Sequence, residues 1–306
     1  MPPRVVPPFA RARLILVYVE DLIGAGETLA GIAAVKRSGS ANCDLRDIEE
    51  VNTFIGMKVM RDPAARKLTL SNPGHTATLL EAFGNETFTW NKAPMASGVQ
   101  LPKTGKDLLP EGTRYADFVG SFLYLCTRTR PDISFAVGVL SRFMSCSEQD
   151  HMRTAKGVLR YLRGTTRLGV FYGGSEPLQG FVDADWERDV DGSRSTTGFV
   201  FTLNGGPIAS ASKRQSSVAT STAEAEYVAA AMENKEARWL RKLLSAPGVD
   251  GEAVPTGEDN QACLALVNNP EATGSIKHVD VTYHSRGRYR PRRSSCFGAS
   301  LALARI

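Results

Sequence analysis

The spacing of hydrophobic residues along the chain changes near residue 168. Between residues 113 and 162 apolar side chains recur every three or four positions, which is the period of a helix with one buried face. After residue 168 apolar and polar residues alternate, which is typical of strands with one buried face. The change of period predicts a domain boundary near residues 164–168.

The first part of the chain is expected to combine short strands with helices. LILVYV is short and rich in β-branched residues, as buried strands are. Ser147 followed by Asp150 resembles a capping box that would start a helix. The expected strands are residues 14–19, 52–60 and 67–71, and the expected helices are residues 75–84, 113–127, 132–145 and 147–162. The hydrophobic faces predicted for two of these helices contain Tyr115, Val119, Phe122 and Leu123, and then Ile133, Val137, Leu140 and Met144.

The second part predicts a sheet followed by helices. Asn204-Gly205 between two alternating runs is a strong signal for a two-residue hairpin. Ser221 and Glu224 form a capping box in front of a long helix. The expected strands are residues 168–173, 178–186, 196–203, 207–212 and 252–257, and the expected helices are residues 222–244, 260–267 and 276–285. The fold class is therefore α/β (α+β), with a mixed sheet and flanking helices.

Carboxylates lie at the ends or middle of four of these elements. Asp183 is on the second strand, Glu226 is in the first turns of the long helix, Asp259 follows a short strand and Asp280 lies near the start of the last helix. Carboxylates gathered at one place repel each other unless cations are bound, and oxygen ligands suit Mg²⁺ or Mn²⁺. Acidic residues at element ends also act as caps and helix-dipole partners, so this pattern alone leaves both interpretations open. Asp185, two residues after Asp183, is either a neighbour of such a site or a solvated edge residue.

Composition narrows the class of protein. The 306 residues are 42% hydrophobic and contain no run of about 18 apolar residues, which argues against a membrane span. The five cysteines are scattered, as in a reduced, intracellular environment (cytoplasm or nucleus), and no zinc spacing is present. The net charge of +5 favours a polyanionic partner, and much of the positive charge is at the end of the chain, at Arg286, Arg288, Arg290, Arg292 and Arg293.

Several motifs in one order resemble a known family. GFVDADW, STAEAEY, EDNQ and IKHVDVTYH are similar to the ribonuclease H domain of copia-type LTR retrotransposon Pol polyproteins. YADFVGSFLYLCTRTRPDISFAVGVLSRF is similar to their connection region, and LILVYVEDLIGAG resembles the hairpin of the reverse transcriptase palm. The resemblance covers roughly residues 13–285. It implies a ribonuclease H-like mixed sheet, preceded by a partial palm and a helical connection.

The resemblance also implies domain limits. Residues 13–110 correspond to a truncated palm and thumb remnant, 111–166 to the connection and 167–285 to the ribonuclease H-like domain. Residues 1–12 and 286–306 do not resemble the family, and we expect them to be a disordered leader and a disordered basic tail.

Matching the family residue by residue implies a nuclease site. Asp183, Glu226, Asp259 and Asp280 correspond to carboxylates that hold two Mg²⁺ or Mn²⁺ ions and support hydrolysis of the RNA strand of RNA–DNA hybrids. Nucleic acid is then the expected partner. The segment Lys213, Arg214 and Gln215 follows the hairpin and is a candidate for phosphate contacts, although a solvated strand edge explains it equally well.

The palm motif departs from the family pattern. Tyr18, Val19, Glu20 and Asp21 stand where the family has Tyr-Val-Asp-Asp, so one carboxylate is moved outward by a methylene group. The other palm aspartate of the family has no counterpart here, and we therefore expect no polymerase activity. The alternative to an active ribonuclease H is a catalytically inactive remnant of the element, or a module that only binds nucleic acid.

Overall fold

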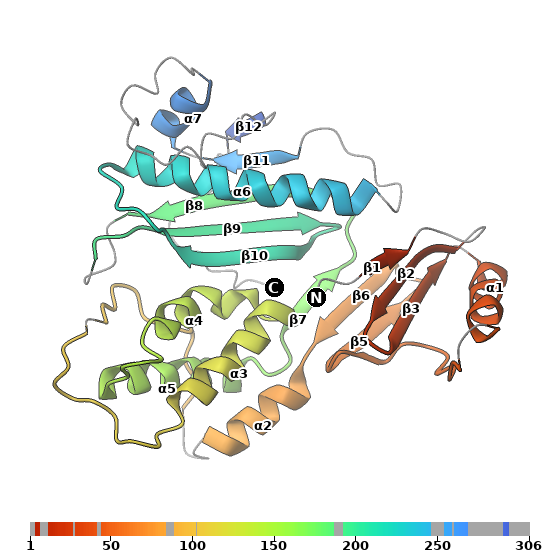
Figure 1. The fold of residues 1–306 in the computed structure, drawn as a ribbon, viewed down its shortest axis with the longest axis horizontal. Coiled ribbons are helices and arrows are strands. Elements are labelled where there is room, and N and C mark those ends of the chain that lie inside the picture. Colours follow the sequence, from red (N-terminus) through yellow and green to blue (C-terminus); the bar gives the residue numbers. More distant parts are fainter. Residues whose placement is uncertain are drawn as a thin grey trace. The chain divides into compact units, whose positions relative to one another are not determined.

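The computed structural model describes residues 4–6, 12–26, 28–41, 44–83, 89–101, 103–186, 192–245, 254–258, 260–268 and 290–293. These residues form helices and several sheets, so the fold is mixed α/β, as the sequence pattern predicted (Figure 1). Contacts divide the chain into two compact units, residues 1–54 with 238–252 and residues 55–237 with 253–306. No helix in the described ranges is both long and apolar enough to cross a bilayer.

The first unit contains an antiparallel sheet and one helix. Its elements are β1 (Arg4–Val6), β2 (Ala12–Tyr18), β3 (Asp21–Gly26) and α1 (Leu29–Ser40). β2 is the central strand, and Tyr18 pairs with Asp21 across a tight turn. The strand expected at residues 14–19 is therefore confirmed and belongs to a hairpin. Val19 in the turn has a φ of 55°, a strained conformation for a β-branched residue.

The second unit follows the short strand β4 (Thr53–Phe54), and its first sheet is antiparallel. Within this unit its strands are β5 (Met57–Asp62), β6 (Lys67–Ser71) and β7 (Gly169–Tyr172), and β6 pairs with both β5 and β7. β7 was expected beside the later strands, but it pairs with β6. The hydrophobic period identifies a strand without identifying its neighbour. Gly169 is required at this pairing, since a Cβ atom there would lie 2.2 Å from the carbonyl oxygen of Leu70.

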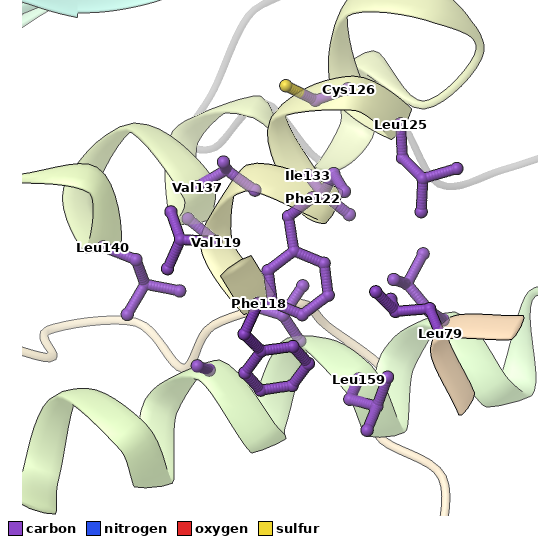
Figure 2. Packing of buried hydrophobic residues seen from close by; sticks show 14 of the residues in the cluster. Leu79, Phe118, Val119, Phe122, Leu125, Cys126, Ile133, Val137, Leu140 and Leu159 are labelled. Atoms are coloured by element: carbon purple, nitrogen blue, oxygen red, sulfur yellow. The ribbon is translucent and has the colours of Figure 1, made fainter. Parts of the chain in front are cut away.

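Helices between β6 and β7 enclose the main hydrophobic core. They are α2 (Pro73–Phe83), α3 (Tyr115–Arg128), the short 3-10 helix η1 (Pro131–Ile133), α4 (Ser134–Ser141) and α5 (Gln149–Gly164). Figure 2 shows Phe118 and Phe122 of α3 within this cluster, and their ring centroids are 4.7 Å apart. Most of the predicted core residues are buried. Two are not. Leu123 is on the exposed side of α3, and Phe118 occupies the core in its place. Met144 lies beyond the end of α4.

The start of α5 differs from the sequence prediction. The helix begins at Gln149, and the backbone N–H of Glu148 donates to Nδ1 of His151 at 2.9 Å. The capping box therefore uses Glu148 and His151 in place of Ser147 and Asp150. The Glu148 carboxylate accepts hydrogen bonds from Thr104 and Gly105 in the preceding connector, and the bond from the Thr104 hydroxyl is the largest cause that lowers the pKa of Glu148. Because these hydrogen bonds hold the Glu148 carboxylate in place, Glu148 rather than Ser147 caps the helix.

A buried ion pair ties the helices together. The guanidinium of Arg130 donates to both carboxylate oxygens of Asp132, at 2.8–3.2 Å. It also donates to the carbonyl oxygen and the hydroxyl of Thr165, just after α5. The Tyr161 hydroxyl donates to Asp132 at 2.8 Å. Burial first, and then the charge of Asp132, raise the pKa of Tyr161 to about 12.

The second sheet of this unit has the order β10-β9-β8-β11-β12 and is mixed. Its strands are β8 (Gln179–Asp185), β9 (Thr196–Leu203), β10 (Gly206–Arg214), β11 (Pro255–Glu258) and β12 (Arg290–Arg293). β8, β9 and β10 are antiparallel, whereas β11 runs parallel to β8 and β12. The predicted hairpin turn is confirmed, with φ of 52° at Asn204 and 79° at Gly205, as a type I′ turn requires.

Two helices accompany this sheet, α6 (Thr222–Ser245) and α7 (Gln261–Asn268) (Figure 1). Both agree with the predicted helices within about two residues. Asn260 caps α7, since its side-chain oxygen accepts the backbone N–H of Cys263 at 2.9 Å. The helix predicted at residues 276–285 lies outside the described residues.

The Arg130–Asp132 pair provides a test of how the helices are held. We expect Asp132→Ala to lower the free energy of unfolding by about 3–5 kcal/mol, because it leaves a buried guanidinium without its carboxylate. Adding Arg130→Met should recover at least half of this loss, since the buried charge is then removed. Urea unfolding followed by circular dichroism measures both values.

The matched control is the exposed pair of Arg114 and Asp117, which are 3.1 Å apart. Asp117→Ala should cost less than about 1 kcal/mol, as exposed ion pairs do. If Asp132→Ala and Asp117→Ala lowered the free energy of unfolding equally, the buried pair would contribute no more to stability than the exposed pair.

Candidate functional site

Strand β8 carries the two acidic residues that the sequence placed side by side. Asp183 pairs with Gly198 of β9, and Asp185 pairs with Thr196, in an uninterrupted register. Both aspartates therefore face the same side of the sheet. Asp183 is exposed and Asp185 is half-buried.

A cation from the helical region reaches this side of the sheet. Arg142, just after α4, donates from Nη2 to the hydroxyl of Thr196 at 3.1 Å. Thr196 is the residue paired with Asp185. The structure thus brings a guanidinium to the strand pair that carries the aspartates. No local sequence signal indicated Arg142, because the contact joins residues 54 positions apart.

Gln215 occupies a different place from the one the sequence suggested. It is buried, with 2% of its surface exposed, and its side-chain nitrogen donates to Thr197 Oγ1 at 3.0 Å and to the Ala225 carbonyl at 2.8 Å. A buried amide with these bonds does not contact phosphates. Thr197 pairs with Ala184, next to Asp183, and Ala225 precedes Glu226. Thr197 and Ala184 face the side of the sheet opposite to Asp183, so Gln215 holds the start of α6 against that opposite side.

The first turn of α6 is capped as predicted. The hydroxyl of Ser221 accepts the backbone N–H of Glu224 at 3.2 Å. The Glu224 carboxylate reaches back to Thr220, accepting its N–H and its hydroxyl at 2.7 Å. Glu226 follows on the buried side of the helix, with 7% of its surface exposed. The cap fixes where α6 begins and hence where Glu226 lies.

A further buried carboxylate on α6, Glu233, was not anticipated from the sequence. Glu233 is fully buried, and its Oε1 accepts a hydrogen bond from the Thr256 hydroxyl of β11 at 3.0 Å. A Cβ atom at Gly180 of β8 would lie 2.3 Å from the same oxygen. α6 is thus seated closely on β8 and β11 together. Glu226 and Glu233 are seven residues apart and share one face of the helix.

The remaining predicted carboxylates, Asp259 and Asp280, lie outside the described residues. β11 ends one residue before Asp259. Within the described side chains, no three His, Cys, Asp or Glu residues come together as a group that could hold a metal ion. The structure therefore gives the positions of two of the four predicted ligands, Asp183 and Glu226.

The candidate contacts to nucleic acid and the palm motif lie in separate units. Lys213 and Arg214 are exposed at the end of β10, which is an edge strand. In the first unit Glu20 is in the turn between β2 and β3, and Asp21 starts β3. Both acidic residues are exposed at the tip of the hairpin.

Comparison with known proteins identifies relatives of the whole stretch. No family model matches the chain. It is 37% identical over 278 residues to the retrovirus-related Pol polyprotein from transposon TNT 1-94 of Nicotiana tabacum, covering 89% of this chain and 21% of that protein. The similar polyprotein from transposon RE2 of Arabidopsis thaliana is 34% identical over 273 residues, covering 88% and 18%. A Saccharomyces cerevisiae protein named for transposon Ty5-1 is 31% identical over 219 residues, covering 71% of each chain. The chain spans about a fifth of the length of the two plant polyproteins.

Gln215 offers a test of how α6 is positioned. Gln215→Leu keeps a side chain of similar size but leaves the Thr197 hydroxyl and the Ala225 carbonyl without this partner. We expect the free energy of unfolding to fall by about 1–3 kcal/mol. Lys213→Ala, two residues away and exposed, should change it by less than about 0.5 kcal/mol. Urea unfolding measures both values, and equal changes in the free energy of unfolding would contradict this role of Gln215.

Proposed function

This chain belongs to the family of copia-type, retrovirus-related Pol polyproteins, and we propose that its mixed sheet with α6 forms a ribonuclease H-type nuclease. Its substrate would be the RNA strand of an RNA–DNA hybrid. The single observation that carries the proposal is the register between β8 and β11. The other supports are the match of Glu226 to the family motif and the exposed cations at the end of β10.

The register supports a pair of neighbouring aspartates. Thr256 pairs with Gly180 and Gly257 with Phe181, in parallel. Continued for two more residues, this register would bring Asp259 level with Asp183. Neighbouring strands are about 4.8 Å apart, so two carboxylates on one face there would repel each other strongly unless a cation lay between them. An exposed aspartate beside a glycine suits a hard, partly hydrated cation.

Glu226 is included in the proposed site because it matches the family motif near the start of α6. Gln215 fixes Ala225, the residue before Glu226, to the pair formed by Thr197 and Ala184. In the proposed site Asp183, Glu226, Asp259 and Asp280 would hold two Mg²⁺ or Mn²⁺ ions. When bound, such ions activate water and stabilise the charge that develops on a phosphate. The carboxylates of the chain set the spacing of the ions, and the sheet keeps them rigid.

Substrate binding is assigned to exposed cations near the site. Lys213 and Arg214 end the edge strand β10 and precede the buried Gln215. A strand edge with two cations is suited to one phosphate backbone. We do not expect reverse transcription from this chain. Glu20 replaces an aspartate at the hairpin tip, and its carboxylate is moved outward by a methylene group. Catalytic groups must be held within about 0.5 Å of their productive positions.

Cleavage of a labelled RNA–DNA hybrid tests the nuclease proposal. The wild-type chain should cleave the RNA strand with Mg²⁺, and chelation should abolish the cleavage. Asp183→Asn should reduce the rate by about 100-fold or more, because it removes a charged ligand. Asp62→Asn, an exposed change on β5, should cleave like the wild type.

Three results would overturn it. Binding of the hybrid without cleavage would indicate a module that only binds nucleic acid. Neither binding nor cleavage would indicate an inactive remnant. Cleavage that survives Asp183→Asn would place the chemistry elsewhere.

A further inference from the structure

Helix α5 carries a line of basic residues on its outer face. Arg153, Lys156, Arg160 and Arg163 are spaced by three, four and three residues. With 3.6 residues per turn these positions fall within an arc of about 80°. The buried residues of α5 lie on the opposite side, against the core. Three of the basic residues are exposed, and Arg160 is half-buried.

The charge of this face is mostly positive. Arg153 forms an ion pair with Asp150, which offsets its charge. Lys156 and Arg163 are exposed further along the same face. These cations extend along about 10 Å of the helix, and the full line from Arg153 along about 15 Å.

An exposed aromatic residue lies beside this line. Trp90 is 62% exposed. A Cβ atom at Gly164 would lie 3.0 Å from Cβ and 3.3 Å from Cε3 of Trp90, so the indole rests on the helix where it has no side chain. The next residue, Asn91, donates from its side chain to the Gly157 carbonyl at 3.2 Å. Gly157 and Gly164 are two turns apart on one face, and they seat the segment of Trp90 next to the basic line. Lys92, also exposed, adds another cation.

We propose that Trp90, Lys92 and the basic face of α5 form a binding surface for single-stranded nucleic acid. Phosphates follow one another along a single strand, so a line of cations on one helix face can contact several of them in succession. An exposed indole stacks on an unpaired base, whereas a duplex hides the faces of its bases. A line of cations beside a stacking ring is the usual construction of surfaces that bind single strands.

This surface is independent of the proposed nuclease site. It lies on α5 and the connector before α3, whereas the proposed ligands lie on β8 and α6 and after β11. Phosphate contacts by cations require no metal ion. Binding can therefore be measured in the presence of a chelator, where the proposed nuclease is inactive, and either proposal can fail without the other.

Fluorescence anisotropy with a labelled 20-nucleotide DNA single strand in EDTA tests the basic face. The double variant Lys156→Gln/Arg163→Gln should lower the slope of log K against log salt by about 1.4 and weaken binding about 25-fold at 0.1 M salt. The matched control, Lys58→Gln/Arg61→Gln on β5, removes the same charge elsewhere and should have a much smaller effect. Equal losses in the two double variants would overturn the proposal.

Trp90→Leu tests the stacking. It should weaken binding of the single strand by about fivefold or more, with an unchanged salt slope and unchanged circular dichroism. Binding of the duplex of the same sequence should be weaker and should not respond to Trp90→Leu. If the duplex binds as tightly, or if polyglutamate competes as well as the single strand, the surface is a general site for polyanions and the proposal is wrong.

Discussion

The seating of α6 on the mixed sheet depends on polar groups that are buried in an otherwise apolar contact. Gln215 bonds to the strand pair and to the helix start, and Glu233 bonds to Thr256 on β11. Buried polar groups are tolerated only with well-placed partners. Hydrogen bonds between such groups fix the helix in one position on the sheet, whereas apolar contacts alone would allow several positions. The position of Glu226 depends on this constraint, because Glu226 is one residue from the Gln215 bond.

Local signals in the sequence were sufficient where neighbouring residues decide the structure. Asn204-Gly205 predicted its turn, since both residues accept positive φ, and Ser221 predicted its cap. Local signals failed where the structure depends on residues that are far apart in the sequence. The cap of α5 depends on Thr104, more than forty positions away, and the pairing of β7 with β6 joins opposite ends of the helical region.

The candidate site shows the same division. The sequence identified Asp183 on a strand and Glu226 at a helix start, and both were placed on those elements. The structure reassigned Gln215 from the surface to the interior, because the hydrogen-bond partners of an amide are invisible in a linear motif. Arg142 and Glu233 were missed for the same reason. The spacing of the basic residues on α5 is visible in the sequence. The proposed binding surface also needs Trp90, and only the fold places Trp90 beside these residues.

Gly180 has a consequence for how this protein can diverge. Any side chain at position 180 collides with the Glu233 carboxylate and comes within 2.8 Å of Phe201. A methyl group at position 180 therefore requires both the Glu233 carboxylate and the Phe201 ring to shift, and the shift would disturb the bond from Thr256. Retention of that bond favours glycine on β8, three residues before Asp183.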